Sequence, residues 1–476
     1  TINAIPGGIY ASADAAPRTI NFTHTGTSVL CSHDGGTTYA ACDSASTLVF
    51  TVADYTGSKV LKIKSSKTGM ADVIYTITLP TDIAGLTFPI CDYLASVSQG
   101  FSTFEAGGGS ALNTAGRVHC IAENAIVTAD ATTTLNVTQN NVSIIGLGTG
   151  ATRGKIVGSS AGNSTIAFNN ATNFKLSNLI ITDAPTGGND MIYGSGLAGY
   201  VTITGCSITN SGNGNPAAVA ISSTGTASSI SHSEIILSQP AAQDASGVVT
   251  IDSGKVTIDS TTFTDTHPTA TMGNLVFTYV PTPPQSPVIT VTNSIFNNSS
   301  HDPIFQVSTG TLSIANSTLT TTSVDGEVLR LSAGDGALIF TLTSSTLTGP
   351  GNAVLISSDP AITSTATIDQ SVLITKGDLA GAAGSRPLRL NRTGAAALTL
   401  TLNRTTFKHL AAGTDTVVLE TAGAGVATIN STLDQNLFCN VGTGSPWFNG
   451  TDDGGGWGGT FVLANQLNGG AIGTCP

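Results

Sequence analysis

Along most of this chain, short runs of alternating apolar and polar residues are separated by clusters of Gly, Ser, Thr and Asn. Alternation with a period of two predicts β-strands, and the clusters predict tight turns between them. One pattern recurs: an aliphatic residue, two or three small polar residues, and a second apolar residue five positions after the first. Its copies read LSNLII, ITGCSI, ISHSEI, IDSTTF, VTNSIF, IANSTL, LTSSTL, IDQSVL and LNRTTF, and they begin at Leu176, Ile203, Ile230, Ile258, Val291, Ile314, Leu342, Ile368 and Leu402.

The spacing of these copies predicts the architecture. From Leu176 to a less regular INSTL at Ile429, the copies follow one another every 28 residues or so, about the length of one solenoid repeat, in steps of unequal length. Unequal steps disfavour a propeller or a leucine-rich repeat and suit a β-helix, whose coils share strands while their loops vary. A second short strand lies upstream in several repeats, as in VLRL (328–331) and PLRL (387–390). We therefore predict an all-β protein dominated by a right-handed parallel β-helix.

The polar residues inside the pattern are expected at a sharp bend between two strands. Asn and Ser side chains can stack there from coil to coil, and Asn tolerates the left-handed backbone that a bend requires. The apolar residues on either side are expected to stack on like residues of the next coil. Ile203, Ile258, Ile314 and Ile368 are then predicted to share one internal column.

The two ends of the chain have a different rhythm. Residues 1–85 give six or seven short strands broken by Gly-rich turns, which predicts a small Ig-like β-sandwich. Residues 86–117 are assigned to a linker and N-terminal cap, 118–436 to the β-helix, and 437–476 to a Gly-rich C-terminal cap.

The N-terminal cap contains a candidate helix. Leu94, Val97, Phe101 and Phe104 fall at helical spacing, and Asp92 is a candidate N-cap. Gly100 weakens this prediction, and a capping loop is the alternative.

Two segments carry resemblances to known families. CIAENAIVTADATTTLNVTQNNVSIIGLGTG (120–150), where a strand feeds an N-V-x-I-x-G turn, resembles the first coils of the pectin-lyase-like β-helix superfamily. That resemblance implies the fold but not one function, because the superfamily holds lyases, hydrolases, adhesins and phage fibre proteins. PGGIY (6–10), CSHDGGTTY (31–39) and VLKIKSS (60–66) resemble the Ig-like modules of chitobiases and bacterial surface proteins, which implies a spacer or a weak binder.

Composition narrows the class of function. The formal net charge is −12, and the chain has no cluster of Lys and Arg, so a nucleic-acid partner is not expected. The acidic balance also disfavours polyanionic substrates, unless a local basic patch overrides it. No apolar run is long enough to predict a transmembrane segment.

The seven cysteines fall into local pairs, and none has the CxxC spacing of a zinc site. The predicted disulfides are Cys31–Cys42, Cys91–Cys120 and Cys439–Cys475, with Cys206 as a single buried thiol. Short-range disulfides predict a secreted or cell-surface protein, and the alternative is a cytosolic protein with seven reduced thiols.

Acidic and imidazole residues follow the second strand of the pattern on neighbouring coils. They are Asp265 and His267, then His301 and Asp302, with Asp325 and Glu327 one coil further on. Adjacent coils bring corresponding residues to about 5 Å, so these groups form a candidate ligand-binding or acid–base site. The alternative is a row of solvated loop residues.

A second candidate site is cationic, and a third is aromatic. Arg330 and Arg389 occupy the related strands VLRL and PLRL, and nearby lie Arg386, Arg392, Arg404, Lys408 and His409. A polysaccharide lyase needs such groups to neutralise a uronate and remove its proton. The Ca²⁺-binding aspartates of pectate lyases and the N-T-D, D-D and H-G set of polygalacturonases are nevertheless missing. Trp447 and Trp457 form either a platform for sugar rings or a cover for the end of the solenoid.

The sequence favours a noncatalytic secreted or cell-surface binding protein, an adhesin or fibre-type receptor-binding protein that recognises glycans or a cell envelope. No catalytic residue, metal or cofactor is assigned. A polysaccharide lyase or glycoside hydrolase that uses the Arg and His residues is the first alternative, and a passive structural spacer is the second. The oligomeric state is left open.

Overall fold

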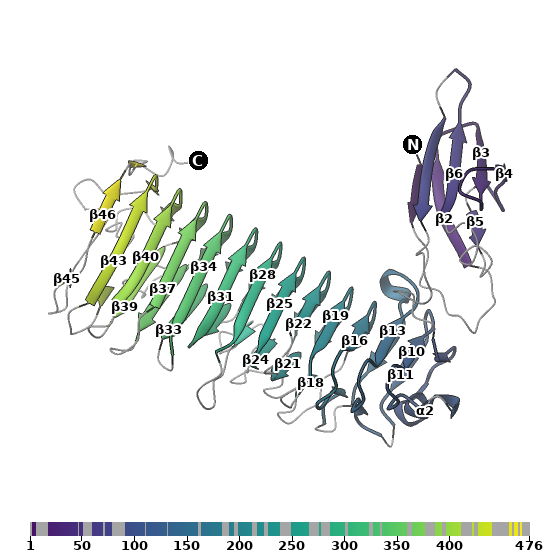
Figure 1. Ribbon diagram of the computed structural model, residues 1–476, viewed down its shortest axis with the longest axis horizontal. Helices are drawn as coiled ribbons and strands as arrows, with labels where there is room; N and C mark the ends of the chain where they lie inside the picture. Colours follow the sequence, from purple (N-terminus) through teal and green to yellow (C-terminus); the bar gives the residue numbers. More distant parts are fainter. Residues whose placement is uncertain are drawn as a thin grey trace.

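A computed structural model describes the chain in segments. These are residues 2–5, 18–45, 47–50, 60–69, 72–78, 91–109, 111–130, 132–159, 163–182, 190–194, 199–211, 217–222, 227–238, 249–265, 276–277, 286–299, 303–322, 327–333, 336–358, 364–376, 386–392, 397–410, 421–422, 427–439, 457–458, 461–464 and 467–468. The described residues are mostly β-strand, with one short α-helix. They form a small antiparallel part followed by a parallel β-helix (Figure 1).

Two antiparallel sheets make up the N-terminal part. One has the order β1-β2-β5 and the other β4-β3-β6-β7. Burial alternates along β6, where Leu61 and Ile63 are fully buried and Lys62 and Lys64 are partly exposed, so this strand has one inner and one outer face. The strands are β1 (Ile2–Ile5), β2 (Arg18–His24), β3 (Ser28–Ser32), β4 (Ala40–Ala41), β5 (Thr47–Phe50), β6 (Val60–Ser66) and β7 (Val73–Thr78).

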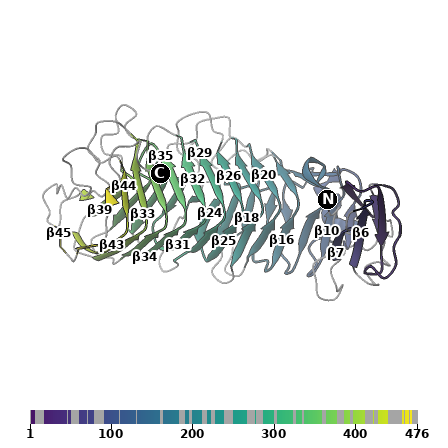
Figure 2. The same ribbon diagram turned by 90° about the horizontal axis from the view of Figure 1, so that it is seen from above.

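Three parallel sheets form the β-helix, and each full coil contributes one strand to each sheet (Figure 2). The first sheet contains β8 (Tyr93–Ala95), β10 (Val118–Ile121), β13 (Ser143–Gly146), β16 (Phe174–Ser177), β19 (Val201–Thr204), β22 (Ser228–Ser231), β25 (Lys255–Asp259), β28 (Val288–Thr292), β31 (Gly310–Ala315), β34 (Leu338–Thr343), β37 (Ser364–Asp369), β40 (Ala397–Asn403), β43 (Ala427–Asp434), β45 (Trp457–Gly458) and β46 (Phe461–Ala464).

The second sheet follows the first across the bend. It contains β9 (Gln99–Gly100), β11 (Ile126–Thr128), β14 (Lys155–Val157), β17 (Ile180–Thr182), β20 (Ser207–Asn210), β23 (Glu234–Leu237), β26 (Thr262–Asp265), β29 (Ile295–Asn298), β32 (Thr318–Thr321), β35 (Thr346–Gly349), β38 (Val372–Thr375), β41 (Thr406–His409), β44 (Leu437–Cys439) and β47 (Leu467–Asn468).

The third sheet completes each coil. It contains β12 (Leu135–Asn136), β15 (Ile166–Ala167), β18 (Ile192–Gly194), β21 (Val219–Ser222), β24 (Val249–Ser253), β27 (Val276–Phe277), β30 (Phe305–Val307), β33 (Leu329–Ala333), β36 (Val354–Ser358), β39 (Leu388–Arg392) and β42 (Thr421–Ala422). The parallel β-helix that the repeat predicts is therefore confirmed.

The predicted internal column is also confirmed. Strand register places Ile203, Ile258, Ile314 and Ile368 in one row, in which Ile230, Val291 and Leu342 fill the intervening coils. All seven side chains are 0–1% exposed. Each buried aliphatic side chain contributes on the order of 1.5–3 kcal/mol through removal of its surface from water. The stacked column is therefore a principal source of the rod's stability.

A column of left-handed residues forms the bend between the first and second sheets. Their φ values lie between 46° and 65°, a left-handed conformation that Gly and Asn adopt at a lower free-energy cost than other residues. The residues are Asn178, Gly205, His232, Ser260, Asn293, Asn316, Ser344, Gln370, Arg404 and Gln435. The predicted left-handed bend is confirmed, although six of these ten positions carry neither Gly nor Asn.

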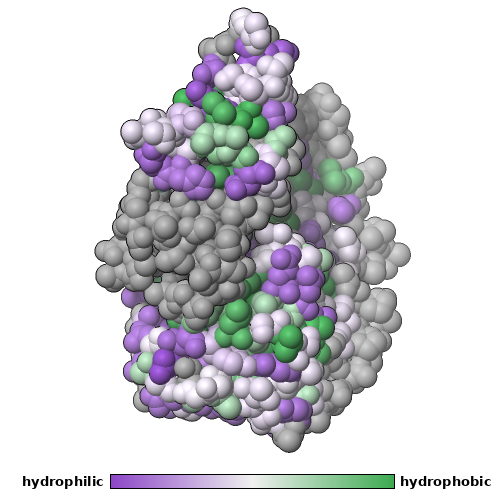
Figure 3. Space-filling view, turned by 90° about the vertical axis from the view of Figure 1, so that its right-hand side faces the viewer, coloured by the Kyte–Doolittle hydropathy of each residue, from purple (hydrophilic) through white to green (hydrophobic). Residues whose placement is uncertain are grey.

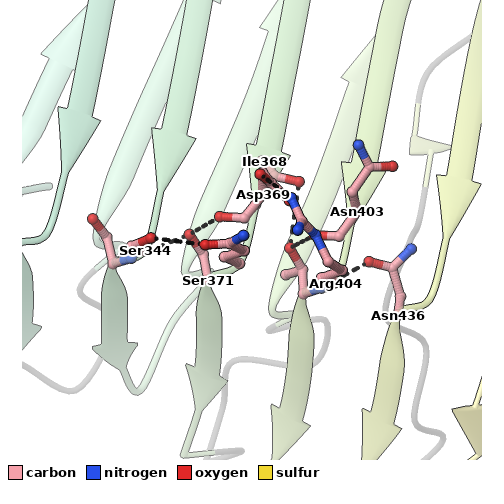
Figure 4. A network of polar contacts seen from close by, with 10 residues as sticks. Ser344, Ile368, Asp369, Ser371, Asn403, Arg404 and Asn436 are labelled. Atoms are coloured by element: carbon pink, nitrogen blue, oxygen red, sulfur yellow. Dashed lines mark hydrogen bonds and ion pairs between the residues drawn. The ribbon is translucent and has the colours of Figure 1, made fainter.

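From Gly205 onward, the residue after each left-handed position points into the rod, and its side chain is hydrogen-bonded there; the residue after Asn178 is the core residue Leu179. Ser371 is typical: its Oγ accepts a hydrogen bond from the backbone N–H of Ser345 at 3.2 Å and donates to the carbonyl of Asp369 at 2.8 Å. Asn436 takes over this role at the C-terminal end, where its Oδ1 accepts from the N–H of Thr405 (Figure 4). These side chains accept hydrogen bonds from the buried N–H groups that the bend leaves without a strand partner. The buried ladder comprises Cys206, Ser233, Thr261, Ser294, Ser317, Ser345, Ser371, Thr405 and Asn436.

The N-terminal cap differs from its prediction. The first parallel strand, β8, pairs with β10, so the β-helix begins at Tyr93 and Leu94 lies in a strand. The only described α-helix, α2 (Phe101–Ala106), begins at Phe101 after Gly100 and is followed by the 3-10 turn η1 (Gly107–Gly109). Phe101 and Phe104 are fully buried as expected, whereas Val97 is 68% exposed.

Asp92 does not cap this helix. Its carboxylate accepts hydrogen bonds from the N–H of Val118 at 2.8 Å and from Arg117 at 2.9 Å. Glu105 likewise accepts from the N–H of Asn136 at 2.9 Å, at the free edge of the third sheet. Glu105 thus pairs with an edge group of β12 that a further strand would otherwise bind. Seen from the N-terminal end of the molecule, the surface carries apolar side chains in small groups among polar ones (Figure 3).

Candidate functional site

The third sheet presents a polar column on its outer face. In β33 the neighbours Leu329 and Leu331 are fully buried, so Arg330 between them points outward, and the same alternation places Arg389 outward in β39. Strand register aligns Arg330 with Leu355 and Leu355 with Arg389. The predicted pairing of the two arginines in one column is therefore confirmed, at a separation of two coils, or about 10 Å.

A polar network holds Arg330 in place. Its Nε donates to Oε2 of Glu327 at 2.7 Å, and Glu327 is the less exposed partner, with 12% of its side chain exposed against 40% for Arg330. Nδ2 of Asn352 donates to Oε1 of Glu327 at 3.1 Å, while Oδ1 of Asn352 accepts from the backbone N–H of Arg386 at 2.9 Å. Three successive coils are thereby linked at this corner, which fixes the guanidinium that faces solvent.

Arg389 is held differently. Its side chain is partly exposed, and within the described part of the chain its buried Nε–H donates no hydrogen bond. A buried donor without a partner costs roughly 1–3 kcal/mol, and a bound ligand or water that accepts from it removes that cost. Gln306 lies one coil before Arg330 in the same column, which therefore runs Gln306, Arg330, Leu355 and Arg389 over four coils.

Other cationic and imidazole residues of the predicted cluster are dispersed. Arg404 lies at the bend and forms a bidentate ion pair with Asp369, with Nη2 at 2.7 Å from Oδ2 (Figure 4). Lys408 points outward from the second sheet, and His409 is 5% exposed on the inner side of that sheet. Of the predicted group, Arg330 and Arg389 share the third-sheet column and Arg386 lies just before β39, while the structure does not describe the side chain of Arg392.

Asp265 is not on an exposed loop, and this expectation is corrected. It is the last residue of β26 and is only 5% exposed. The reason is the period of two: Phe263 points inward, so the residue two positions later returns to the inner face. Asp265 belongs to a buried polar column at the end of the second sheet, with Asn298, Thr321 and Thr375.

The remaining predicted groups lie wholly or partly outside the described residues. His267, His301, Asp302, Asp325 and Trp447 are not described. The backbone of Trp457 begins β45, which pairs in parallel with β43, while nothing is described of its side chain. A ligand-binding role for these residues stays a prediction.

Two of the predicted disulfides are present, Cys31–Cys42 and Cys91–Cys120. Cys439 is also disulfide-bonded, and its predicted partner Cys475 lies outside the described residues. Cys206 is a free, buried thiol, as predicted. Burial raises the pKa of this thiol to about 11, and backbone hydrogen bonds lower it only in part. The disulfides indicate folding in an oxidising, extracytoplasmic environment.

Within the described residues, no helix is long and apolar enough to cross a membrane. The same residues also contain no group of three or more His, Cys, Asp or Glu side chains placed to hold a metal ion.

Comparison with models of protein families, with curated proteins and with solved structures finds no match to this chain. The likeness to the pectin-lyase-like superfamily therefore stays at the level of the β-solenoid, and no family is assigned.

Proposed function

We propose that this chain is a noncatalytic binding protein of the secreted or cell-surface kind, an adhesin or fibre-type receptor-binding protein, whose third sheet recognises a glycan of a cell envelope. The observation that carries the proposal is the register of Arg330 with Arg389 on a rigid face. Guanidinium groups bind carboxylates in a two-pronged manner and donate to hydroxyls. An extended acidic glycan that lies along the rod would meet both groups.

Preorganisation supports binding at this column. Glu327 and Asn352 fix Arg330 from behind, so little side-chain entropy is lost when a ligand arrives. The net charge of −12 weakens long-range attraction of an anion, and the affinity must come from close contacts with this local group of cations.

The spacing of the column favours binding over bond cleavage. An acid–base pair acts on one bond, so its members must lie within hydrogen-bond reach of the same reacting atoms. Arg330 and Arg389 are about 10 Å apart, since two coils separate them, and Leu355 stands between them. That arrangement suits repeated contacts along a polymer.

Two other functions compete with this one. Arg330, Arg386 and Arg389 would also neutralise a uronate in a polysaccharide lyase or glycoside hydrolase of the pectin-lyase-like superfamily. A passive structural spacer would need no ligand at all, and the N-terminal module suits that role equally.

One paired experiment separates the three. The full chain is applied to a glycan array rich in uronate and other acidic sugars, and the same glycans are incubated with it and assayed for reducing ends and for absorbance at 235 nm. We expect retention on acidic glycans without product. Product formation would establish the enzyme, and absence of both retention and product would overturn binding at the arginine column and favour the spacer.

A further inference from the structure

The outer face of the first sheet carries a column made only of Thr and Ser over eight successive coils. Each member lies between two buried residues of its strand, points outward and is partly exposed. Strand register aligns each member with the next. The members are Thr202, Ser229, Thr257, Thr290, Ser313, Thr341, Thr367 and Thr401, and together they are called the hydroxyl column.

Within the described part of the chain, the hydroxyls of this column have no hydrogen-bond partner, although their neighbours form hydrogen bonds readily. In the adjacent outward column, Oγ1 of Thr204 and Oγ of Ser231 are 3.1 Å apart, and Thr292 and Asn293 both donate to Asp259. In the buried ladder, every serine hydroxyl donates to a carbonyl. The donor and acceptor positions of these eight hydroxyls are therefore available to an external partner.

The face around the column is broad, open and nearly uncharged. Figure 1 shows the strands of the first sheet side by side along the rod, with no other described element laid over them. The flanking outward positions include Val288, Thr311, Ile339, Thr365 and Thr399. The few charges nearby are Lys175, which precedes Thr202 in the same column, Lys255 and Asp259 in β25, and Asp369, which is neutralised by Arg404.

We infer that the hydroxyl column is a binding surface for a neutral linear polysaccharide that lies along the axis of the rod. A column of eight coils spans about 34 Å at a coil spacing of about 4.8 Å, so it offers one hydroxyl per coil to a chain of several sugar units. Thr supplies a hydroxyl and a methyl group at each step, which matches the hydroxyl edges and apolar C–H faces of a sugar ring.

Charge selects a neutral polymer over a charged one. An acidic polysaccharide would find no column of cations on this face and would be repelled by the net charge of −12. A basic polymer would find no row of free carboxylates. Because the surface consists of strands, many weak contacts to a polymer can form together without the entropic cost of ordering loops.

This surface is independent of the proposed function, since it lies on the first sheet and not on the third. Its test is retention of the full chain on insoluble cellulose and chitin, and on a soluble neutral β-glucan by affinity electrophoresis. The test variant is the triple substitution Thr290→Val, Thr341→Val and Thr367→Val, which removes hydroxyls while keeping shape and strand propensity. The matched control is Thr262→Val, Thr318→Val and Thr346→Val on the outer face of the second sheet.

We expect the wild-type chain to bind at least one of these polymers and to keep its affinity in high salt, since neutral contacts are not screened. The first-sheet variant should bind at least tenfold more weakly at an unchanged melting temperature, and the second-sheet control should bind like wild type. Equal binding by the first-sheet variant would overturn the inference, as would a wild-type chain that binds none of these neutral polymers. Binding of acidic glycans tests only the arginine column of the third sheet and does not bear on this inference.

Discussion

The thiol of Cys206 occupies the place that the hydroxyl of Ser233 fills on the next coil. The N–H of Cys206 donates to Oγ of Ser233 at 3.1 Å, and Sγ of Cys206 donates to the carbonyl of Thr204 at 3.5 Å, as Oγ of Ser233 does to Ser231 at 2.8 Å. The lone cysteine is thus one member of the buried ladder and needs no redox role to explain it.

This relationship predicts the effect of substitutions at Cys206. Cys206→Ser should leave stability unchanged or raise it slightly, because a hydroxyl is the better donor to the carbonyl of Thr204. Cys206→Ala should cost ~1–3 kcal/mol, because it leaves the buried N–H of Leu179 without its acceptor. Urea denaturation of both variants measures the difference, and equal loss in the two would show that the sulfur acts through packing alone.

Stability at alkaline pH should depend on the same residue. The folded pKa of about 11 lies above the ordinary value of 9.0, so between these values the unfolded chain holds fewer protons than the native chain. Stability is therefore complete below pH 9 and falls as pH rises toward 11, by up to about 1.4 kcal/mol per pH unit. Compared with wild type, Cys206→Ser should lose less stability across this window; parallel loss in both would assign the effect to other groups.

The internal column predicts a severe core substitution. Ile314→Asp places a carboxylate among Val291, Leu342 and their neighbours, where no counter-charge is available. The cost should be several kcal/mol, with a large fall in the melting temperature. The control is Ser313→Asp, one residue away on the outer face, which should change stability by less than about 1 kcal/mol. Equal melting temperatures for wild type and Ile314→Asp would contradict the register.

The cysteine pattern predicts the result of thiol counting. Under denaturing, non-reducing conditions one cysteine, Cys206, should react with a maleimide, and peptide mapping should link Cys439 to Cys475 in addition to the two disulfides already seen. A second reactive cysteine, or a different partner for Cys439, would contradict this pairing.

Much of this fold follows from the sequence because one pattern records the register of two sheets. The residues before and after the bend point inward on every coil, so Ile203 and Ile208 both mark the core. The same period of two indicates that Asp265 lies inside with Phe263, a signal that the expectation of an exposed loop overlooked. The hydroxyl column has the same origin, since it consists of the residues between inward positions of the first sheet.

The candidate site was less accessible to sequence reasoning. Related strands predicted the pairing of Arg330 with Arg389, but nothing local revealed that Glu327 and Asn352 would meet across coils, because the loops between them differ in length. Asp92 shows a similar limit at the N-terminal end. Its position before Leu94 suggested a helix cap, whereas Leu94 lies in a strand and the carboxylate of Asp92 accepts from the N–H of Val118 at the start of β10.

The most direct test of the account is a calorimetric titration of the full chain with the tightest acidic oligosaccharide from the array. The comparison is between wild type, the double variant Arg330→Gln with Arg389→Gln, and the control Arg404→Gln, whose guanidinium is engaged by Asp369 on another face. The account predicts at least tenfold weaker binding by the double variant, wild-type binding by the control, and affinity that falls with salt. Equal affinity in wild type and the double variant, at equal melting temperatures, would contradict it.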